Sequence, residues 1–577
     1  MRREGYYHRK CENRRGALGT GVTVFGGIAR RRLKAPKSKR LLLLLLALFS
    51  LGVYGLQAEG RQKIDERWCA LLLEGRTVGY LHQSTWGSAD GLMRSEIEQT
   101  MEILRFGVPF TLSQRDAWIE HPQRGLISLS SETDMNGQLQ RVDARAQQGD
   151  VEVTVACGAD RQSFVLEADG PIGIYEADRR LTEAIREWSS GAERASVEVS
   201  YHLFSPETFK IEQVDLRIIG EGELEDSRGL THRGLVIEER SSSLPGVVTT
   251  EIYGEQARFL YARTPVGLAL EILRIDAEPK AKAPELFDVA ALTIAVSGLE
   301  ELKRPLAAVE AVTIRFHGRG AAILKRATAS AERDLDAGAG RAGAKRNLYA
   351  RIVSASTDAR AADAQLVQRL TDPALRDTAE TDRGFPAYGH EPPAEAKAYL
   401  RAGFHLDLDD PRLERLAEDC AIPLSTRRAG KPSGSEISMV APEQLECLER
   451  SVYRYIRTKS LDYGFADLQQ ILSSRSGDCT EHALLLAAVL RRIGIPARLA
   501  YGLILTEIGF IGHAWTEMFA GDHWIWLDSS FPEPRDYGMK IRLGVMDPAQ
   551  PYWADLGLDL LRVTAGVRAE ILEVEYR

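Results

Sequence analysis

The chain contains little cysteine, with 6 cysteines among its 577 residues. A protein of this length can bury a sufficient core without disulfide bonds, which excludes the class of small cysteine-stapled scaffolds. Residues 60–290 also lack the closely spaced histidines and cysteines of a metal site and the glycine-rich loop that cradles a phosphate. The sequence therefore predicts neither a cofactor nor a bound metal ion.

Basic charge is concentrated at the start of the chain and is outweighed elsewhere. Residues 1–40 hold thirteen Lys and Arg and two acidic residues, a local charge of +11. The whole chain carries −8, so subtracting +11 leaves −19 for residues 41–577. An acidic body repels phosphate, which argues against nucleic-acid binding by the basic arm. The asymmetry predicts that the two parts occupy different environments.

An uncharged apolar run, Leu41–Leu56, follows the basic arm. It is shorter than the about 20 residues of a relaxed membrane-spanning helix and longer than a typical signal-peptide core. Basic residues before such a run hold the N-terminus in the cytoplasm. We therefore expect residues 1–40 to be a cytoplasmic tail, residues 41–58 to be a transmembrane or signal segment, and the bulk of a single-pass chain to be extracytoplasmic. A buried core helix and a later start codon are the alternatives.

Residues 60–290 are typical of a β-rich extracytoplasmic module. Polar and apolar residues alternate in three stretches, Trp68–His82, Asp150–Gly158 and Val197–Phe204. The pattern is weaker over Glu96–Phe110, for which we predict an edge strand, and Arg179–Trp188 is predicted to be the single helix. No chemistry-bearing motif occurs in this module, so we expect it to position another part of the chain or to bind a partner.

Residues 291–395 are predicted to be a mixed segment and linker, with a strand over Val309–Gly318 and a small, glycine-rich, charged stretch at residues 327–345. Helical patterns return in residues 396–577. Asp410 is an N-cap before Pro411. Together with Asp407 and Asp409 it could suggest calcium, but the glycine and terminal glutamate of an EF-hand loop are missing. Capping is the preferred reading.

The stretch Ser474–Phe531 is the most informative. Asp478 and Glu481 form a capping box, Gly494 ends the helix that follows, and the residues between are apolar nearly all round, which predicts a buried helix. Cys479 is the first residue after the cap. A thiol there lies at the positive end of the helix dipole, so we expect its pKa to be lowered toward the reactive thiolate.

His513 and Asp528 lie on two strand-like segments joined by a turn near Gly521, which predicts that they face each other across a hairpin. A histidine oriented by a carboxylate and presented to a thiol is the arrangement of a cysteine nucleophile. Cys479, His513 and Asp528 are therefore the candidate catalytic residues. The backbone N–H of Cys479, with Tyr463 or Gln470, is expected to donate to the oxyanion.

Other residues near this set have two readings. His482 is interpreted as a supporting or capping residue, and Glu517 as a structural partner of an arginine such as Arg498. The tryptophans that share a face with His513 are either walls of a substrate cleft or packing residues of the sheet: Trp515, Trp524 and Trp526.

The motif GDCTEHALLLAAVLRRIGIPARLAYGLI, followed by HAWTE and WIWLDSS, closely resembles the bacterial transglutaminase-like superfamily. The resemblance implies an α+β, papain-like domain over residues 396–577, with its core at 461–547. It implies acyl transfer through a Cys479 thioester on a protein or peptide substrate. We expect hydrolysis first and transamidation second; a non-catalytic cell-envelope scaffold is the alternative. The oligomeric state is left open.

Export also bears on the cysteines. With Cys11 in the cytoplasm, five cysteines would lie outside, an odd number that would leave one thiol free if two disulfides form. The pairings that stay within one predicted domain are Cys69 with Cys157 and Cys420 with Cys447. Five reduced cysteines is the other reading.

Overall fold

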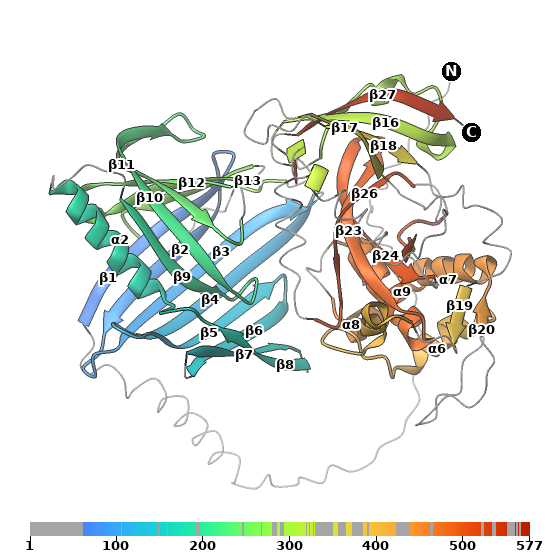
Figure 1. Cartoon of the computed structure of the whole chain (residues 1–577), viewed down its shortest axis with the longest axis horizontal. Helices are drawn as coiled ribbons and strands as arrows, with labels where there is room; N and C mark the ends of the chain where they lie inside the picture. The colour runs from blue at the N-terminus through green and yellow to red at the C-terminus, as the bar shows by residue number, and fades with distance from the viewer. Residues whose placement is uncertain are drawn as a thin grey trace, which may run out of the picture. The chain divides into compact units, whose positions relative to one another are not determined.

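The computed structural model describes most of the chain between residues 62 and 576 (Figure 1). The described residues are 62–105, 107–147, 149–158, 160–190, 197–244, 247–266, 268–279, 285–288, 293–318, 320–321, 324–326, 328, 350–355, 365–371, 385–388, 392–422, 438–461, 466–520, 524–533, 538–550, 560, 563–564 and 567–576. The predicted basic tail and membrane segment, residues 1–58, lie outside them. Within these ranges, no helix is both long and apolar enough to cross a membrane.

The first half of the described chain is one large antiparallel sheet. Its strands are β1 (Gln62–Leu73), β2 (Arg76–Gly87), β3 (Met93–Arg105), β4 (Val108–His121), β5 (Gly125–Met135), β6 (Gln138–Gln147), β7 (Asp150–Cys157), β8 (Asp160–Glu167), β9 (Glu198–Ser205), β10 (Lys210–Glu225), β11 (Thr231–Ser241), β12 (Thr249–Tyr253), β13 (Phe259–Val266) and β14 (Leu268–Ile275). The order is β8-β7-β6-β5-β4-β3-β2-β1-β14-β13-β12-β11-β10-β9, so hairpin neighbours pair and β1 joins β14. The predicted β-rich character is confirmed.

The prediction of an edge strand over Glu96–Phe110 is wrong. These residues form most of β3, which pairs with β2 on one side and β4 on the other, and the beginning of β4. The alternation is weak because polar residues pair across neighbouring strands here. Gln99 donates to Gln114 at 2.8 Å, and Arg115 donates to Glu98 at 2.8 Å. Cross-strand polar pairs stabilise a strand without an apolar pattern.

The predicted helix in this half is present as α2 (Ile174–Ser189), which begins five residues earlier than Arg179. Its first turn is held by Glu120 of β4, whose two carboxylate oxygens each accept from the N–H of Tyr175 at 3.1 Å. A Cβ at Gly173 would lie 1.9 Å from Glu120 Oε1, so a larger residue there would displace the carboxylate that holds the helix start. Burial raises the pKa of Glu120 to about 7. This cap comes from a distant strand, and local sequence could not reveal it.

The second half combines helices with smaller sheets. The helices are α5 (Ala394–Lys397), α6 (Pro411–Glu418), α7 (Pro442–Tyr455), α8 (Leu468–Ser474) and α9 (Cys479–Arg492). A four-stranded antiparallel sheet has the order β25 (Trp524–Leu527), β24 (Gly509–Phe519), β23 (Ala497–Thr506) and β26 (Lys540–Met546). Helix α9 packs against β23 and β24 (Figure 1). Every residue of α9 from Thr480 to Arg491 is buried, which confirms the predicted buried helix.

A five-stranded sheet joins distant parts of the chain. Its order is β15 (Val296–Ser297), β27 (Arg568–Tyr576), β16 (Val309–His317), β18 (Gln365–Thr371) and β17 (Ala350–Ala355). Two small sheets pair β19 (Phe385–Tyr388) with β20 (Ser438–Val440), and β21 (Thr458–Lys459) with β22 (Ser476–Gly477). Side chains of β16 share an apolar core with residues of β23, β24 and β26. Residues of the predicted mixed segment therefore help to support the four-stranded sheet.

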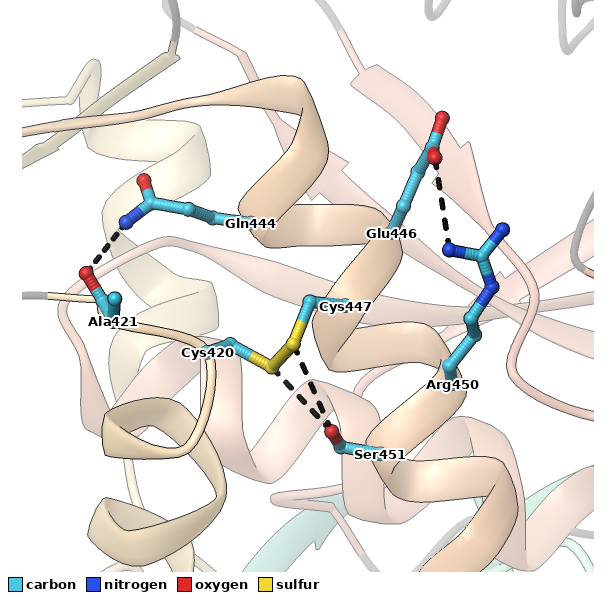
Figure 2. The surroundings of a disulfide bond; sticks show 7 residues. All are labelled: Cys420, Ala421, Gln444, Glu446, Cys447, Arg450 and Ser451. Atoms are coloured by element: carbon cyan, nitrogen blue, oxygen red, sulfur yellow. Dashed lines mark hydrogen bonds and ion pairs between the residues drawn. A yellow bond between two sulfur atoms is a disulfide. The ribbon is translucent and has the colours of Figure 1, made fainter.

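A disulfide joins Cys420, just after α6, to Cys447 of α7 (Figure 2). The Ser451 hydroxyl lies 3.4 Å from the sulfur of Cys420. In the chain-entropy account, closing a loop with a sequence separation of 27 stabilises the folded state by about 3.5 kcal/mol. The predicted pairing of Cys69 with Cys157 is wrong, and both thiols are free. Cys69 is on β1 and Cys157 on β7, and the strands β2 to β6 separate them along the sheet.

Candidate active site

The start of α9 is built as the sequence predicts. Asp478 Oδ1 accepts from the N–H of Thr480 at 2.8 Å, and Glu481 Oε2 accepts from the N–H of Asp478 at 2.7 Å, which completes the capping box. The other oxygen of Asp478 accepts from Arg105, the last residue of β3, at 3.1 Å. Cys479 follows the cap and is partly exposed. The start of the helix thus fixes the position of the thiol.

His513 of β24 and Asp528, the residue after β25, form a hydrogen-bonded pair. His513 Nε2 lies 2.8 Å from Asp528 Oδ2, and the carboxylate is fully buried. The hairpin register, in which Thr516 pairs with Leu527, brings the two side chains together. The turn near Gly521 lies outside the described residues. Because Asp528 occupies Nε2, the nitrogen left to accept a proton from a thiol is Nδ1.

Cys479 lies beside the same strand. The backbone N–H of Ala514, the residue after His513, forms a hydrogen bond with the Cys479 sulfur. Two further bonds tie α9 to the hairpin: Thr516 Oγ1 donates to the carbonyl of Ala483 at 2.9 Å, and Ser529 Oγ donates to the carbonyl of His482 at 3.2 Å. The fold therefore brings the three predicted residues into one place.

The expectation of a lowered thiol pKa is wrong. Burial raises the pKa of Cys479 above its ordinary range, the charge on Asp478 raises it further, and the N–H of Ala514 only partly opposes them. The charges on Glu481 and Asp528 act in the same direction as Asp478. Burial and the neighbouring carboxylates thus favour the neutral thiol. A neutral thiol at this position has to lose its proton as it attacks, so a base must take that proton.

Asp528 is held by residues that the sequence reading missed. Lys540 of β26 places its Nζ 3.1 Å from Asp528 Oδ2, and both side chains are fully buried. Glu449 of α7 accepts from the backbone N–H of Asp528 at 2.6 Å. Burial alone would raise the pKa of Asp528, but Lys540 and His513 outweigh burial and hold that pKa below its ordinary value. The sequence could have indicated Glu449, because a glutamate at helical spacing from Leu445 and Val452 lies on the buried face of α7.

His482 supports the helix and is not placed as the base. Its Nε2 accepts from Lys459 Nζ at 2.6 Å, while its Nδ1 bonds to the carbonyl of Asp478. Burial lowers the pKa of His482 to about 4, so its ring is neutral near pH 7. Lys459 also donates to the carbonyls of Tyr453 and Ile456 at 2.7 Å each. The predicted supporting role of His482 agrees with these bonds.

The residues of the sheet face next to His513 are packed together. Glu517 accepts from Arg498 at 2.9 Å and from Arg542 at 3.1 Å, which confirms its predicted pairing with Arg498. The three tryptophans that share this face are buried, which favours packing over a cleft wall: Trp515, Trp524 and Trp526. Phe531 is partly exposed, and its ring centroid is 5.4 Å from that of His513.

The side chain of Gln470, one of the two predicted oxyanion donors, is engaged at the start of α8. It is the N3 residue of α8, where its Oε1 accepts from the N–H of Asp467 and from Gln138, each at 3.1 Å. Tyr463, the other candidate, lies outside the described residues. Asp410 caps α6 by accepting from the N–H of Arg412 at 2.9 Å, as predicted. In the described ranges, no group of three or more His, Cys, Asp or Glu side chains could hold a metal ion.

Comparison with known proteins identifies a family for the part of the chain that holds Cys479, His513 and Asp528. The sequence model of the transglutaminase-like superfamily matches residues 436–529. Among curated proteins, no sequence matches the chain. A β-barrel-like protein from Brucella abortus is 10% identical, with a TM-score of 0.27, and the similarity covers 37% of this chain and 95% of that protein. A candidate cysteine protease from Cytophaga hutchinsonii is 14% identical, with a TM-score of 0.24 and coverage of 47% and 86%.

The matched residues contain α7, α8, α9, the hairpin of β24 and β25, and all three candidate residues. Residues 436–529 are therefore a transglutaminase-like superfamily domain.

Proposed function

We propose that this chain is a thiol enzyme that hydrolyses peptide or amide bonds through an acyl-thioester on Cys479. The observation that carries the proposal is the hydrogen bond between His513 and Asp528, 2.8 Å long. The residue after His513, Ala514, forms a backbone hydrogen bond with the Cys479 sulfur. Asp528 fixes the imidazole so that Nδ1 is the basic nitrogen, and the anion stabilises the imidazolium that forms. The raised pKa of Cys479 calls for such a base.

The reaction would proceed in two halves. The thiol proton passes to Nδ1 of His513 while the sulfur of Cys479 adds to the carbonyl carbon. The imidazolium then gives that proton to the leaving nitrogen, the C–N bond breaks, and an amine departs from the thioester. In the second half His513 takes a proton from water, the hydroxide adds to the thioester, and the C–S bond breaks. The acid leaves, and the proton on His513 returns to the sulfur.

An amine that enters in place of water would give transamidation by the same steps. A peptide library that includes glutamine residues, incubated with and without a labelled primary amine, separates the two outcomes. We expect new termini or ammonia, with no label in the products. Label uptake would instead assign a cross-linking enzyme. If the wild type gives none of these products while Cys479→Ala still complements a deletion strain, the domain is a scaffold and the proposal fails.

We also propose that the chain is anchored in the cell membrane through residues 41–58, with residues 60–577 extracytoplasmic. The charge of +11 before Leu41 supports this orientation. The Cys420–Cys447 disulfide supports an oxidising compartment. A reporter active only in the cytoplasm will therefore be silent when it is fused after Arg577 of the full chain. The same fusion to a chain that begins at residue 62 should be active, and activity in both would contradict the proposed topology.

A further inference from the structure

A fully buried lysine lies behind the proposed triad. Lys540 is the first residue of β26, and its Nζ is 3.1 Å from Asp528 Oδ2 and 4.0 Å from the centre of the Trp526 ring. Removing an ammonium group from water is costly unless an anion compensates it. The carboxylate of Asp528 is that anion, and the aromatic face of Trp526 gives the ammonium of Lys540 a second favourable contact.

The carboxylate of Asp528 is fixed at both oxygens. Oδ1 accepts from the N–H of Ser530 at 3.0 Å. Oδ2 is shared by His513 Nε2 at 2.8 Å and Lys540 Nζ at 3.1 Å. A charge-assisted hydrogen bond from an ammonium is stronger than one between neutral groups. Lys540 therefore fixes both the rotation of the carboxylate and the oxygen that faces the imidazole.

Lys540 also interacts electrostatically with a second buried carboxylate, that of Glu449. The side chain of Glu449 is buried, accepts from the backbone N–H of Asp528 at 2.6 Å and attracts the ammonium of Lys540. A buried carboxylate without a compensating cation becomes protonated at a higher pH, because its charged form is disfavoured in a low-dielectric site. The charged and titratable groups that act on Asp528 or Lys540 come from four elements: His513 of β24, Lys540 of β26, Glu449 of α7, and Cys479 and His482 of α9.

We propose that Lys540 is a positioning residue of the active site, which keeps Asp528 ionised and turned toward His513 Nε2. This role rests on the proposed thiol chemistry, since Lys540 acts on the reaction only through Asp528 and His513. The geometry that carries it is the Asp528 oxygen Oδ2, which both His513 Nε2 and Lys540 Nζ contact.

The pH dependence has a definite sign. The pKa of Asp528 is below its ordinary value, so in the wild type the carboxylate stays ionised as pH falls toward about 4. Without Lys540, its contribution to lowering that pKa is lost while burial still raises it, so Asp528 becomes protonated at a higher pH. The neutral acid supports the imidazole less well, so the Cys479 thiol loses base assistance on the acid side.

The test uses the full chain with Lys540→Met and a matched control, Arg542→Met. Arg542 is two residues along β26 and is also buried, but it pairs with Glu517. The rate of Cys479 alkylation by iodoacetamide is measured between pH 4 and 8 by peptide mass spectrometry, under conditions where near-ultraviolet circular dichroism reports a folded protein. In Lys540→Met we expect an extra acid step, with the rate reduced on the order of tenfold below it. The Arg542→Met profile should follow the wild type.

Two further variants assign the step. Asp528→Asn combined with Lys540→Met should remove it, and Lys540→Arg, which keeps the charge, should restore the wild-type profile. If Lys540→Met does not fold, Lys540→Gln takes its place, because glutamine can donate to Oδ2 without a charge and should show the same step. Superimposed profiles for the uncharged variants and the wild type would overturn the proposal. Alkylation needs no substrate, so a step without turnover would keep Lys540 in this role and reject the hydrolase.

Discussion

Substitution of Cys479 by alanine will abolish turnover, with a loss on the order of a millionfold in kcat. The carboxylates and imidazoles beside Cys479 cannot form a thioester because they carry no sulfur, and the other free cysteines of the described residues lie on β1 and β7. His513→Ala should be nearly as damaging. The double substitution should be no worse than either, because nucleophile and base act as a unit.

The comparison is made on any peptide that the wild type cleaves, with kcat and KM determined for each variant. Cys479→Ala should fold, since it removes one sulfur atom from the first residue of α9 at a cost of about 1 kcal/mol. Cys157→Ala is the matched control, because that thiol is also free and partly exposed but belongs to β7 of the large sheet. Activity of Cys479→Ala within about tenfold of the wild type would be incompatible with covalent catalysis.

Asp528→Asn should lower kcat by about ten-thousandfold while KM changes little. The amide keeps the shape of the carboxylate and can still accept from Nε2 of His513, but it has no charge with which to stabilise the imidazolium. The substitution also leaves the buried ammonium of Lys540 without its 3.1 Å partner, so the free energy of unfolding should fall as well.

Asp547→Asn separates loss of function from loss of stability. Asp547 accepts from the buried Arg491 at 2.7 Å, so its substitution also breaks a charge pair in this domain. We expect Asp547→Asn to lower the free energy of unfolding and to leave kcat near the wild-type value at a temperature where both variants are folded. Equal losses of kcat in the two variants would mean that Asp528 acts only through stability.

The part of the site that the sequence predicted is encoded by local signals. Asp478, Glu481 and the apolar run that follows specify one buried helix with a thiol at its start, and the residues around the β24–β25 turn specify the pairing of His513 with Asp528. Each of these signals spans only a few residues, so the elements can be predicted without knowledge of tertiary contacts. The same holds for the alternating strands of the large sheet.

The part that the sequence could not predict depends on contacts between distant residues. A lysine at the start of a strand is usually exposed to solvent. Lys540 is instead buried, where it pairs with the carboxylate of Asp528. The pKa of Cys479 is raised where a lowered value was expected, because burial by the surrounding fold, and to a smaller extent the charges on Asp478, Glu481 and Asp528, favour the neutral thiol. The start of α2 is fixed by Glu120, more than fifty residues away.

Direct detection of the acyl-enzyme tests the central claim. The wild type, mixed with an activated peptide ester, is quenched in acid and digested, and the acylated peptide is identified by mass spectrometry. We predict an acyl group on Cys479 that forms within one turnover, decays as acid is released, and is absent from that position in Cys479→Ala. No acyl group on Cys479 in the wild type, or an equal load on Cys157, would contradict the account.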